Sequence, residues 1–229
     1  MHASSGQAEG PLAGAANSAF FKIFSGASDM NEIKPRFEFR TWAQNFGKVE
    51  EKMRKLSACL GIRESAETYI ISAGNDENNT KIRDKLMDIK VFVTEREGLE
   101  QWNPRMKGEF PMRATMLESD VFPAFGVEMP PLQRDVYTLE QYLDEVIRPH
   151  PQLSAVSVFK RRFAFTINDC ITEHAEIRIN GAGLQTVAVE SVDVPAILEA
   201  KKMLGLDEYE NVNYLRAIKR VIGLEALPA

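Results

Sequence analysis

The chain has 229 residues, of which 44% are hydrophobic, so it is long and apolar enough to form one domain with a buried core. Its net charge of −5 argues against a general nucleic-acid coat, and no apolar run approaches the roughly 18 residues of a membrane span. Two cysteines, Cys59 and Cys170, and three histidines give neither a disulfide framework nor a zinc signature. Any metal would therefore be a hard cation on carboxylates, and we expect a cytoplasmic protein without nucleic-acid or membrane partners.

The first 30 residues are rich in Ala, Gly and Ser, and they lack the basic start and apolar centre of a secretory signal. We expect residues 1–30 to be disordered or loosely docked. Residues 31–229 are then expected to form a single domain.

A strand followed by a helix is expected at the start of this domain. Residues 36–40 alternate strictly, with Phe37 and Phe39 on one face and three charged side chains on the other. Apolar residues then recur at intervals of three or four from Trp42 to Leu60, which predicts an amphipathic helix of about 19 residues that ends at Gly61.

The next segments repeat the alternation of charged and apolar residues. Residues 67–72 read as a short strand, and residues 80–83 and 88–93 as the arms of a hairpin. Lys81 and Arg83 share one face of the first arm. The pattern dissolves over residues 94–131, where we expect one short strand around Trp102 and a packed loop from residue 120.

The last third of the chain is expected to hold three strands flanked by helices. Thr138 caps a helix that ends before Pro149, and Asp193 caps another that ends at Gly205. A last helix opens at Asn211 or a neighbouring residue. Between them, residues 156–193 read as three consecutive strands joined by two Asn-containing turns.

Charge follows each of these three strands along one face. Lys160 and Arg162 lie opposite a phenylalanine face, and the third strand leads to Glu190. On the second strand, Glu176 and Arg178 share a face with Thr172 and His174, opposite an aliphatic face. Two explanations stay open: a sheet with one face on a core and the other in water, or a sheet curved around a polyanion.

Cations outnumber carboxylates among the residues that lie opposite an apolar face. Cations gathered on a concave surface repel one another unless an anion is bound there. Arg and Lys hold phosphate oxygens, and a few carboxylates among them suit a divalent cation that bridges phosphates. No Walker loop and no GxSxG elbow is present. The set comprises Arg36, Glu38, Arg40, Lys81, Arg83, Lys90, Lys160, Arg162, Glu176, Arg178 and Glu190.

The order of these pieces resembles the CYTH family, also called triphosphate tunnel metalloenzymes, over roughly residues 33–225. The resemblance implies an α+β fold: an eight-stranded antiparallel β-barrel, or tunnel, with helices packed outside. It implies Mg²⁺ or Mn²⁺ held by Glu38, Glu176 and Glu190, with Glu38 and Glu190 catalytic. It also implies a triphosphate gripped by Arg36, Arg40, Lys81, Arg83, Lys90, Lys160, Arg162 and Arg178.

Two departures from the family pattern each remove an expected metal oxygen. Arg36 stands where the family's opening motif has a glutamate, and Ala188 stands where the late strand often carries a second one. Glu173 falls in phase with the apolar set of its strand, so it is a ligand only if a bulge shifts that strand.

Four functions remain open. They are metal-dependent hydrolysis of inorganic or nucleoside triphosphate, polyphosphate or nucleotide binding without turnover, an adenylate-cyclase-like activity, and a structural domain whose charged face is merely hydrated.

Overall fold

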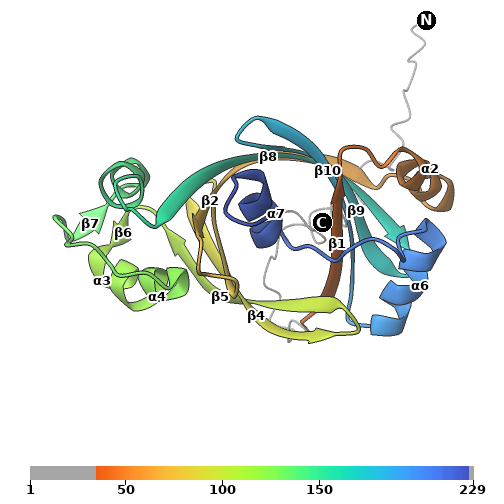
Figure 1. Cartoon of the computed structure of the whole chain (residues 1–229), viewed down its shortest axis with the longest axis horizontal. Coiled ribbons are helices and arrows are strands. Elements are labelled where there is room, and N and C mark those ends of the chain that lie inside the picture. Colours follow the sequence, from red (N-terminus) through yellow and green to blue (C-terminus); the bar gives the residue numbers. More distant parts are fainter. Residues whose placement is uncertain (1–34, 227–229) are drawn as a thin grey trace, which may run out of the picture. The chain divides into compact units, whose positions relative to one another are not determined.

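Eight strands form a closed antiparallel barrel in the order β1-β10-β9-β8-β2-β3-β4-β5 (Figure 1). The structure is a computed structural model that describes residues 35–226, so the expectation for residues 1–30 lies outside the described residues. The fold class implied by the resemblance is confirmed. The strands are β1 (Phe37–Ala43), β2 (Gly61–Ser72), β3 (Asn78–Arg83), β4 (Leu86–Arg96), β5 (Leu99–Glu109), β8 (Leu153–Ile167), β9 (Cys170–Ile179) and β10 (Ala182–Ser191).

Two-residue turns set the register of the hairpins. Asn168 and Asp169 between β8 and β9 have φ values of 50° and 57°, and Asp84 and Lys85 between β3 and β4 have 52° and 60°. Positive φ at both central residues gives the turn whose twist matches that of the strands. The predicted three-strand meander and the predicted hairpin are both confirmed, with longer strands than the sequence suggested.

The first helix is shorter than its apolar periodicity predicted. Helix α2 spans only Gly47–Leu56, and Trp42 belongs to strand β1. The predicted helix is confirmed over residues 47–56, but its predicted ends at Trp42 and Leu60 are wrong, because a strand residue and exposed side chains completed the spacing by chance. Helix α2 packs with α6 (Val194–Leu204) on the outer face of the barrel, where Phe39 and Met53 are fully buried.

Residues 94–131 are more regular than the sequence suggested. Strand β4 continues to Arg96, and β5 follows after a tight turn at Glu97 and Gly98. The expected packed loop after residue 120 is wrong, because this region includes short helices. The elements that follow β5 are β6 (Met112–Arg113), α3 (Ala114–Met116), the π-helical turn η1 (Leu117–Val121), α4 (Phe122–Phe125), β7 (Val136–Tyr137), α5 (Leu139–Gln141) and the π-helical turn η2 (Tyr142–Ile147).

These short elements form a second apolar core on the outer face of β2, β3 and β4. Leu117, Phe125 and Tyr142 are buried there against Ile70 and Ile89. Thr138 caps α5 as predicted, since its hydroxyl accepts a hydrogen bond from the Gln141 amide and the Gln141 side chain bonds back. The described residues contain no helix that could span a membrane.

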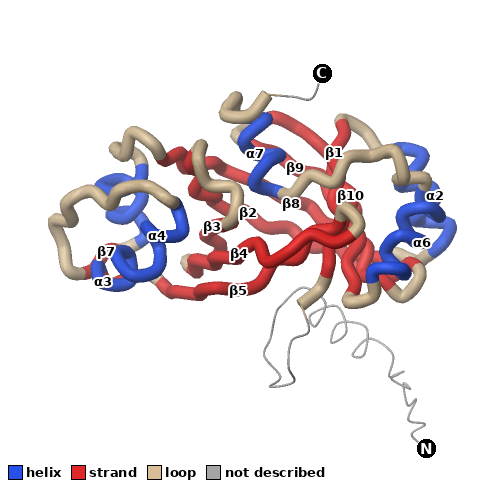
Figure 2. Tube along the Cα trace, turned by 60° about the horizontal axis from the view of Figure 1, so that its bottom comes forward, coloured by secondary structure: helices blue, strands red, loops and turns tan. Residues whose placement is uncertain are grey.

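The last helix, α7 (Tyr214–Val221), closes one end of the barrel. Asn213 caps it, and Figures 1 and 2 place it against the ring of strands. Tyr214, Leu215 and Ile218 pack on interior side chains that include Val158 and Ile177. The end of the barrel interior next to α7 is therefore apolar, and the charged side chains lie in the rest of the interior.

Candidate functional site

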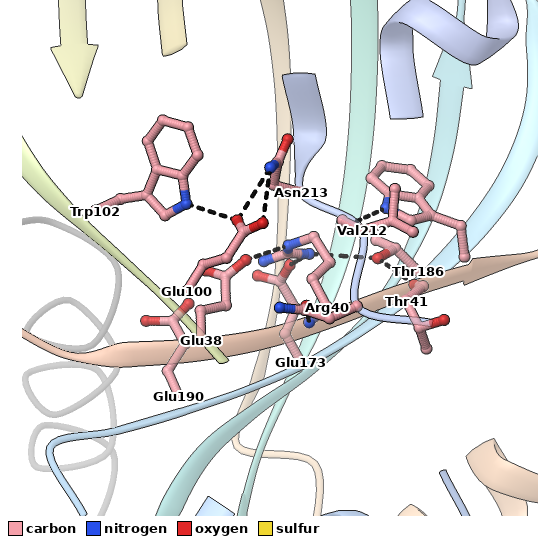
Figure 3. Close-up of polar contacts among 12 residues, drawn as sticks. Glu38, Arg40, Thr41, Glu100, Trp102, Glu173, Thr186, Glu190, Val212 and Asn213 are labelled. Carbon is pink, nitrogen blue, oxygen red and sulfur yellow. Dashed lines mark hydrogen bonds and ion pairs between the residues drawn. The ribbon is translucent and has the colours of Figure 1, made fainter. Parts of the chain in front are cut away.

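Charged side chains from many strands meet inside the barrel. Arg40 of β1 reaches Glu173 of β9, although β10 lies between these two strands, and the two side chains are 3.4 Å apart. Glu38 and Glu190 lie in the same neighbourhood (Figure 3). Of the residues expected to share one surface, the structure places together Arg36, Glu38, Arg40, Lys81, Arg83, Lys90, Lys160, Arg162 and Glu190.

Glu67 lies at the centre of the cations, although sequence reasoning did not single it out. Its side chain is 0% exposed. Lys160 Nζ is 2.8 Å from Oε2, and Arg162 Nη2 donates to Oε1 at 2.8 Å. Arg83 Nη1 lies 3.5 Å from Glu67 Oε1, and Lys81 Nζ lies 3.9 Å from Glu67 Oε2. Burial opposes the charged form, but the charges of Lys160, Lys81 and Arg162 dominate and hold the pKa of Glu67 far below its usual value.

A second ion-pair network surrounds Arg40. Its Nε donates to Glu38 Oε1 at 2.6 Å, and its Nη1 lies 3.4 Å from both Glu173 Oε1 and Thr186 Oγ1 (Figure 3). The guanidinium also stacks over the Tyr214 ring, 4.7 Å from its centroid. Burial disfavours the charge, but Glu38 and the other neighbours raise the pKa of Arg40 well above its usual value. Arg40 is thus a permanently charged side chain that two carboxylates already pair.

Lys160 is enclosed on every side. Its ammonium donates to Tyr69 Oη at 2.6 Å, lies 2.8 Å from Glu67 Oε2, and faces the Tyr214 ring at 3.6 Å. The side chain is only 2% exposed. Burial lowers the pKa of Lys160, against the charge of Glu67. As arranged, Lys160 supports the interior and turns no donor toward a ligand.

The remaining cations are open to solvent, and we call them the open cations. Side chains of Arg36, Arg83 and Lys81 are 43%, 27% and 19% exposed, and Lys90 is exposed. Arg63, which sequence reasoning missed, is partly exposed and faces Arg162 in register across β2 and β8. Burial and the charges of Arg83 and Arg162 lower the pKa of Arg63, which places it in the same cluster. Arg36, Arg63, Lys81, Arg83 and Lys90 are the open cations.

Three glutamates form a row across adjacent strands. Glu38 of β1 lies opposite Glu190 of β10 on one side and Glu100 of β5 on the other. Glu100 was not predicted as a site residue; it accepts hydrogen bonds from Trp102 Nε1 at 2.8 Å and from Asn213 Nδ2 (Figure 3). Trp102 packs beside the apolar core that α7 completes, and its indole N–H faces this polar cluster.

Glu38 and Glu190 lie opposite one another, and their pKa values shift in opposite directions. Burial favours the neutral form of both carboxyls, but the charge and hydrogen bond of Arg40 lower the pKa of Glu38. Burial and the negative charge of Glu38 raise the pKa of Glu190 to about 7. Near neutral pH, Glu38 is therefore ionised and Glu190 is the carboxyl that titrates.

The expectation that Glu176 and Arg178 share this surface is wrong. On β9 it is Glu173, not Glu176, that faces the barrel interior, where it pairs with Arg40 and Arg162. The pairing of β9 with β8 is regular, so Glu173 reaches the interior without a bulge. Glu176 is 51% exposed and contacts Arg161 on the outer face. Arg178, two residues on, lies on that same outer face and is exposed. The apolar set of β9 faces inward because helix α7 fills that end of the barrel.

The carboxylates do not fit a resident divalent cation as they are arranged. Between residues 35 and 226, no three histidine, cysteine, aspartate or glutamate side chains come together in a way that could hold a metal. Glu38 is bonded to Arg40 at 2.6 Å, and Glu190 pairs with Arg36 at 3.6 Å. Guanidinium groups thus occupy carboxylate oxygens that a metal would need.

Glu190 is expected to make stability depend on pH near neutrality. Because its pKa is raised in the folded state, the folded protein holds a proton that the unfolded chain releases from about pH 4.5, and this stabilisation is lost as pH rises through about 7. Between pH 5.5 and 8, wild type should lose roughly 1–2 kcal/mol more than Glu190→Gln, allowing for partial exposure. Urea unfolding at both pH values measures this, and equal losses in the two proteins would contradict the assignment.

Several solved structures are similar to this chain, all at low sequence identity. The putative adenylyl cyclase HpAC1 from Hippeastrum, described as having a dominant triphosphatase activity, is 13% identical with a TM-score of 0.46, over 84% of this chain and 98% of that one. A putative adenylate cyclase from Bacillus halodurans is 9% identical with a TM-score of 0.47, over 79% and 95%. The PH1012 protein of Pyrococcus horikoshii OT3 is 16% identical with a TM-score of 0.46, over 79% and 97%.

No family model matches the chain, and no curated protein matches it either. The barrel itself therefore carries the comparison with the CYTH family. Its eight antiparallel strands close in a ring. The charged residues on β1, β3, β4, β8 and β10 to which the resemblance gave a role meet inside this ring. The fold is the eight-stranded antiparallel barrel that the resemblance to the CYTH family implied.

Proposed function

We propose that the barrel interior binds a small polyphosphate, either inorganic triphosphate or the triphosphate of a nucleotide. The observation that carries this proposal is the group of open cations, which lie on or beside the four strands β1 to β4 and keep water-accessible surface. Lys81 and Arg83 lie on β3, Lys90 on β4 next to it, and Arg63 on β2 at its other side. Adjacent strands thus present cations in series, as a chain of phosphates requires.

The chemistry of these groups favours phosphate over a single carboxylate. Arginine offers a planar fork of N–H donors that matches two phosphate oxygens, and lysine adds a compact point charge. Interior carboxylates already satisfy the enclosed cations Arg40 and Lys160. The open cations keep exposed surface, so they are the groups that a phosphate chain would meet first.

Metal-dependent hydrolysis is a second candidate, favoured by the row of Glu190, Glu38 and Glu100. Mg²⁺ or Mn²⁺ would supply charge neutralisation and an activated water if it were bound. The pairing of Glu38 and Glu190 with arginines weighs against a resident metal. Binding without turnover is therefore the function that the geometry supports best.

Lys90→Ala should weaken tripolyphosphate binding about tenfold or more, because it removes one charge-assisted contact. Isothermal titration with tripolyphosphate and with ATP measures this. Arg161→Ala is the matched control, since Arg161 lies on the outer face between Lys160 and Arg162 and should leave affinity unchanged. Equal effects of the two substitutions would contradict the interior site.

The same proteins should be assayed for phosphate, pyrophosphate and cyclic nucleotide release, with and without Mg²⁺ or Mn²⁺. Turnover that Glu190→Ala abolishes would favour the hydrolase. Cyclic nucleotide as the product would favour a cyclase. Binding without any product supports the binding function proposed here.

A further inference from the structure

One feature of the interior is not needed for polyphosphate binding and opposes it. Glu67 is a completely buried carboxylate that contacts Lys81, Arg83, Lys160 and Arg162. All four cations belong to the set that the resemblance assigned to phosphate. An anion already occupies the position around which these side chains converge.

The four contacts divide into two classes. Lys160 and Arg162 lie at 2.8 Å and are almost fully buried, with side-chain exposures of 2% and 8%. Lys81 and Arg83 lie at 3.9 and 3.5 Å and keep 19% and 27% exposure. The first two contacts, with a hydrogen bond from Ser65 Oγ at 3.2 Å, hold the carboxylate in place. The second two are loose ion pairs on cations that also face solvent.

Neutralising one carboxylate does not require four cations. Two close partners satisfy its charge, and each added cation repels the others unless a further anion arrives. Asp88 lies only 4.0 Å from Lys81 but is itself partly exposed. Lys81 and Arg83 are therefore held weakly by Glu67 and remain available to a more highly charged anion.

We propose that Glu67 is a built-in competitor for phosphate, which holds Lys81 and Arg83 until a phosphate group of higher charge displaces those two contacts. This inference rests on the proposed function and adds a rule of selectivity to it. A monophosphate gains too little to displace the contacts and also meets repulsion from the Glu67 charge. A polyphosphate offers several charged groups at once and engages the other open cations as well.

Glu67→Gln tests the proposal, because it removes the charge and keeps the shape. It should bind tripolyphosphate at least about tenfold more tightly than wild type, which corresponds to about 1.4 kcal/mol. Its preference for tripolyphosphate over monophosphate should also fall. Isothermal titration with inorganic monophosphate and tripolyphosphate measures both. Glu64→Gln is the matched control, since Glu64 lies on the outer face of the same strand with 58% exposure and should behave as wild type.

A second variant covers the case in which Glu67→Gln does not fold. Removing one member of a buried pair leaves a charge without compensation, whereas neutralising both members is tolerated. The double variant Glu67→Gln with Lys160→Met removes the buried pair together. Since Lys160 turns no donor toward a ligand, the double variant should also bind tripolyphosphate more tightly than wild type.

The outcomes separate the inference from the function beneath it. Tighter tripolyphosphate binding by either Glu67 variant, with wild-type affinity in Glu64→Gln, supports the inference that Glu67 competes with phosphate. If wild type binds tripolyphosphate and the folded Glu67 variants bind it equally or more weakly, Glu67 does not compete with phosphate. The proposed binding function then still holds. If neither wild type nor any variant binds polyphosphate, both the function and the inference fail.

Discussion

Tyr214→Ala is expected to lower the free energy of unfolding by about 3–5 kcal/mol, the range for removing a buried aromatic side chain. Tyr214 is 9% exposed and opens helix α7. Its ring packs edge-on against Trp42 at 4.9 Å, stacks on Tyr69 at 5.8 Å, and covers the Lys160 ammonium at 3.6 Å. Alanine would leave a cavity at the closed end of the barrel and expose the buried lysine to water.

Tyr214→Phe is the matched control for this loss. The Tyr214 hydroxyl is buried and has no hydrogen-bond partner among the described residues, so its removal should cost little or stabilise slightly. Urea unfolding of the three proteins measures the difference. A loss below about 1 kcal/mol for Tyr214→Ala would mean that α7 does not close the barrel as described.

The double variant Lys81→Ala with Arg83→Ala is expected to reduce tripolyphosphate affinity about a hundredfold or more. Each side chain supplies a charge-assisted contact of about 1.5–3 kcal/mol to an anion. The variant should stay folded, because Glu67 keeps its two close partners, Lys160 and Arg162, at 2.8 Å. Calorimetric titration measures the affinity, and the unfolding midpoint checks the fold.

Arg161→Ala with Arg178→Ala is the matched control for this double variant. It removes the same number of cations, but from the outer face, where both side chains are exposed. If the control keeps the wild-type affinity, then binding of tripolyphosphate depends on the position of the cations inside the barrel and not on the net charge of the protein. A comparable loss in both double variants would mean that tripolyphosphate binds by general attraction, without the interior.

Much of the interior could be predicted by counting alternate residues along strands. Alternation correctly grouped Lys81 with Arg83 on β3 and Lys160 with Arg162 on β8, since strand side chains point to opposite faces in turn. Turn residues at Asn168 and Asp169 fixed the register between β8 and β9. These signals are local, so one sequence is enough to reveal them.

Strand β9 shows where alternation stops being sufficient. The period separates Glu173 from Glu176, but it does not say which face is inside. Grouping Glu176 and Arg178 with the interior residues placed the aliphatic face outside the barrel, whereas helix α7 supplies an apolar partner inside it. Only the position of a segment about forty residues later decides the question, and strand periodicity does not contain that position.

Glu67 and Arg63 were missed for a related reason. The helix was extended to Leu60, so residues 61–66 received no strand and Arg63 no face. Glu67 then opened a short apolar strand, where it read as an end residue and not as an interior one. Extending the alternation back from Tyr69 through Glu67 and Ser65 to Arg63 is the signal that could have found both.

A crystal structure of the protein soaked with tripolyphosphate tests the central claim most directly. The account predicts the anion inside the barrel, in contact with Lys81, Arg83 and Lys90. Tripolyphosphate bound only to the outer face beside Arg161 and Arg178, with an unchanged interior, would contradict it.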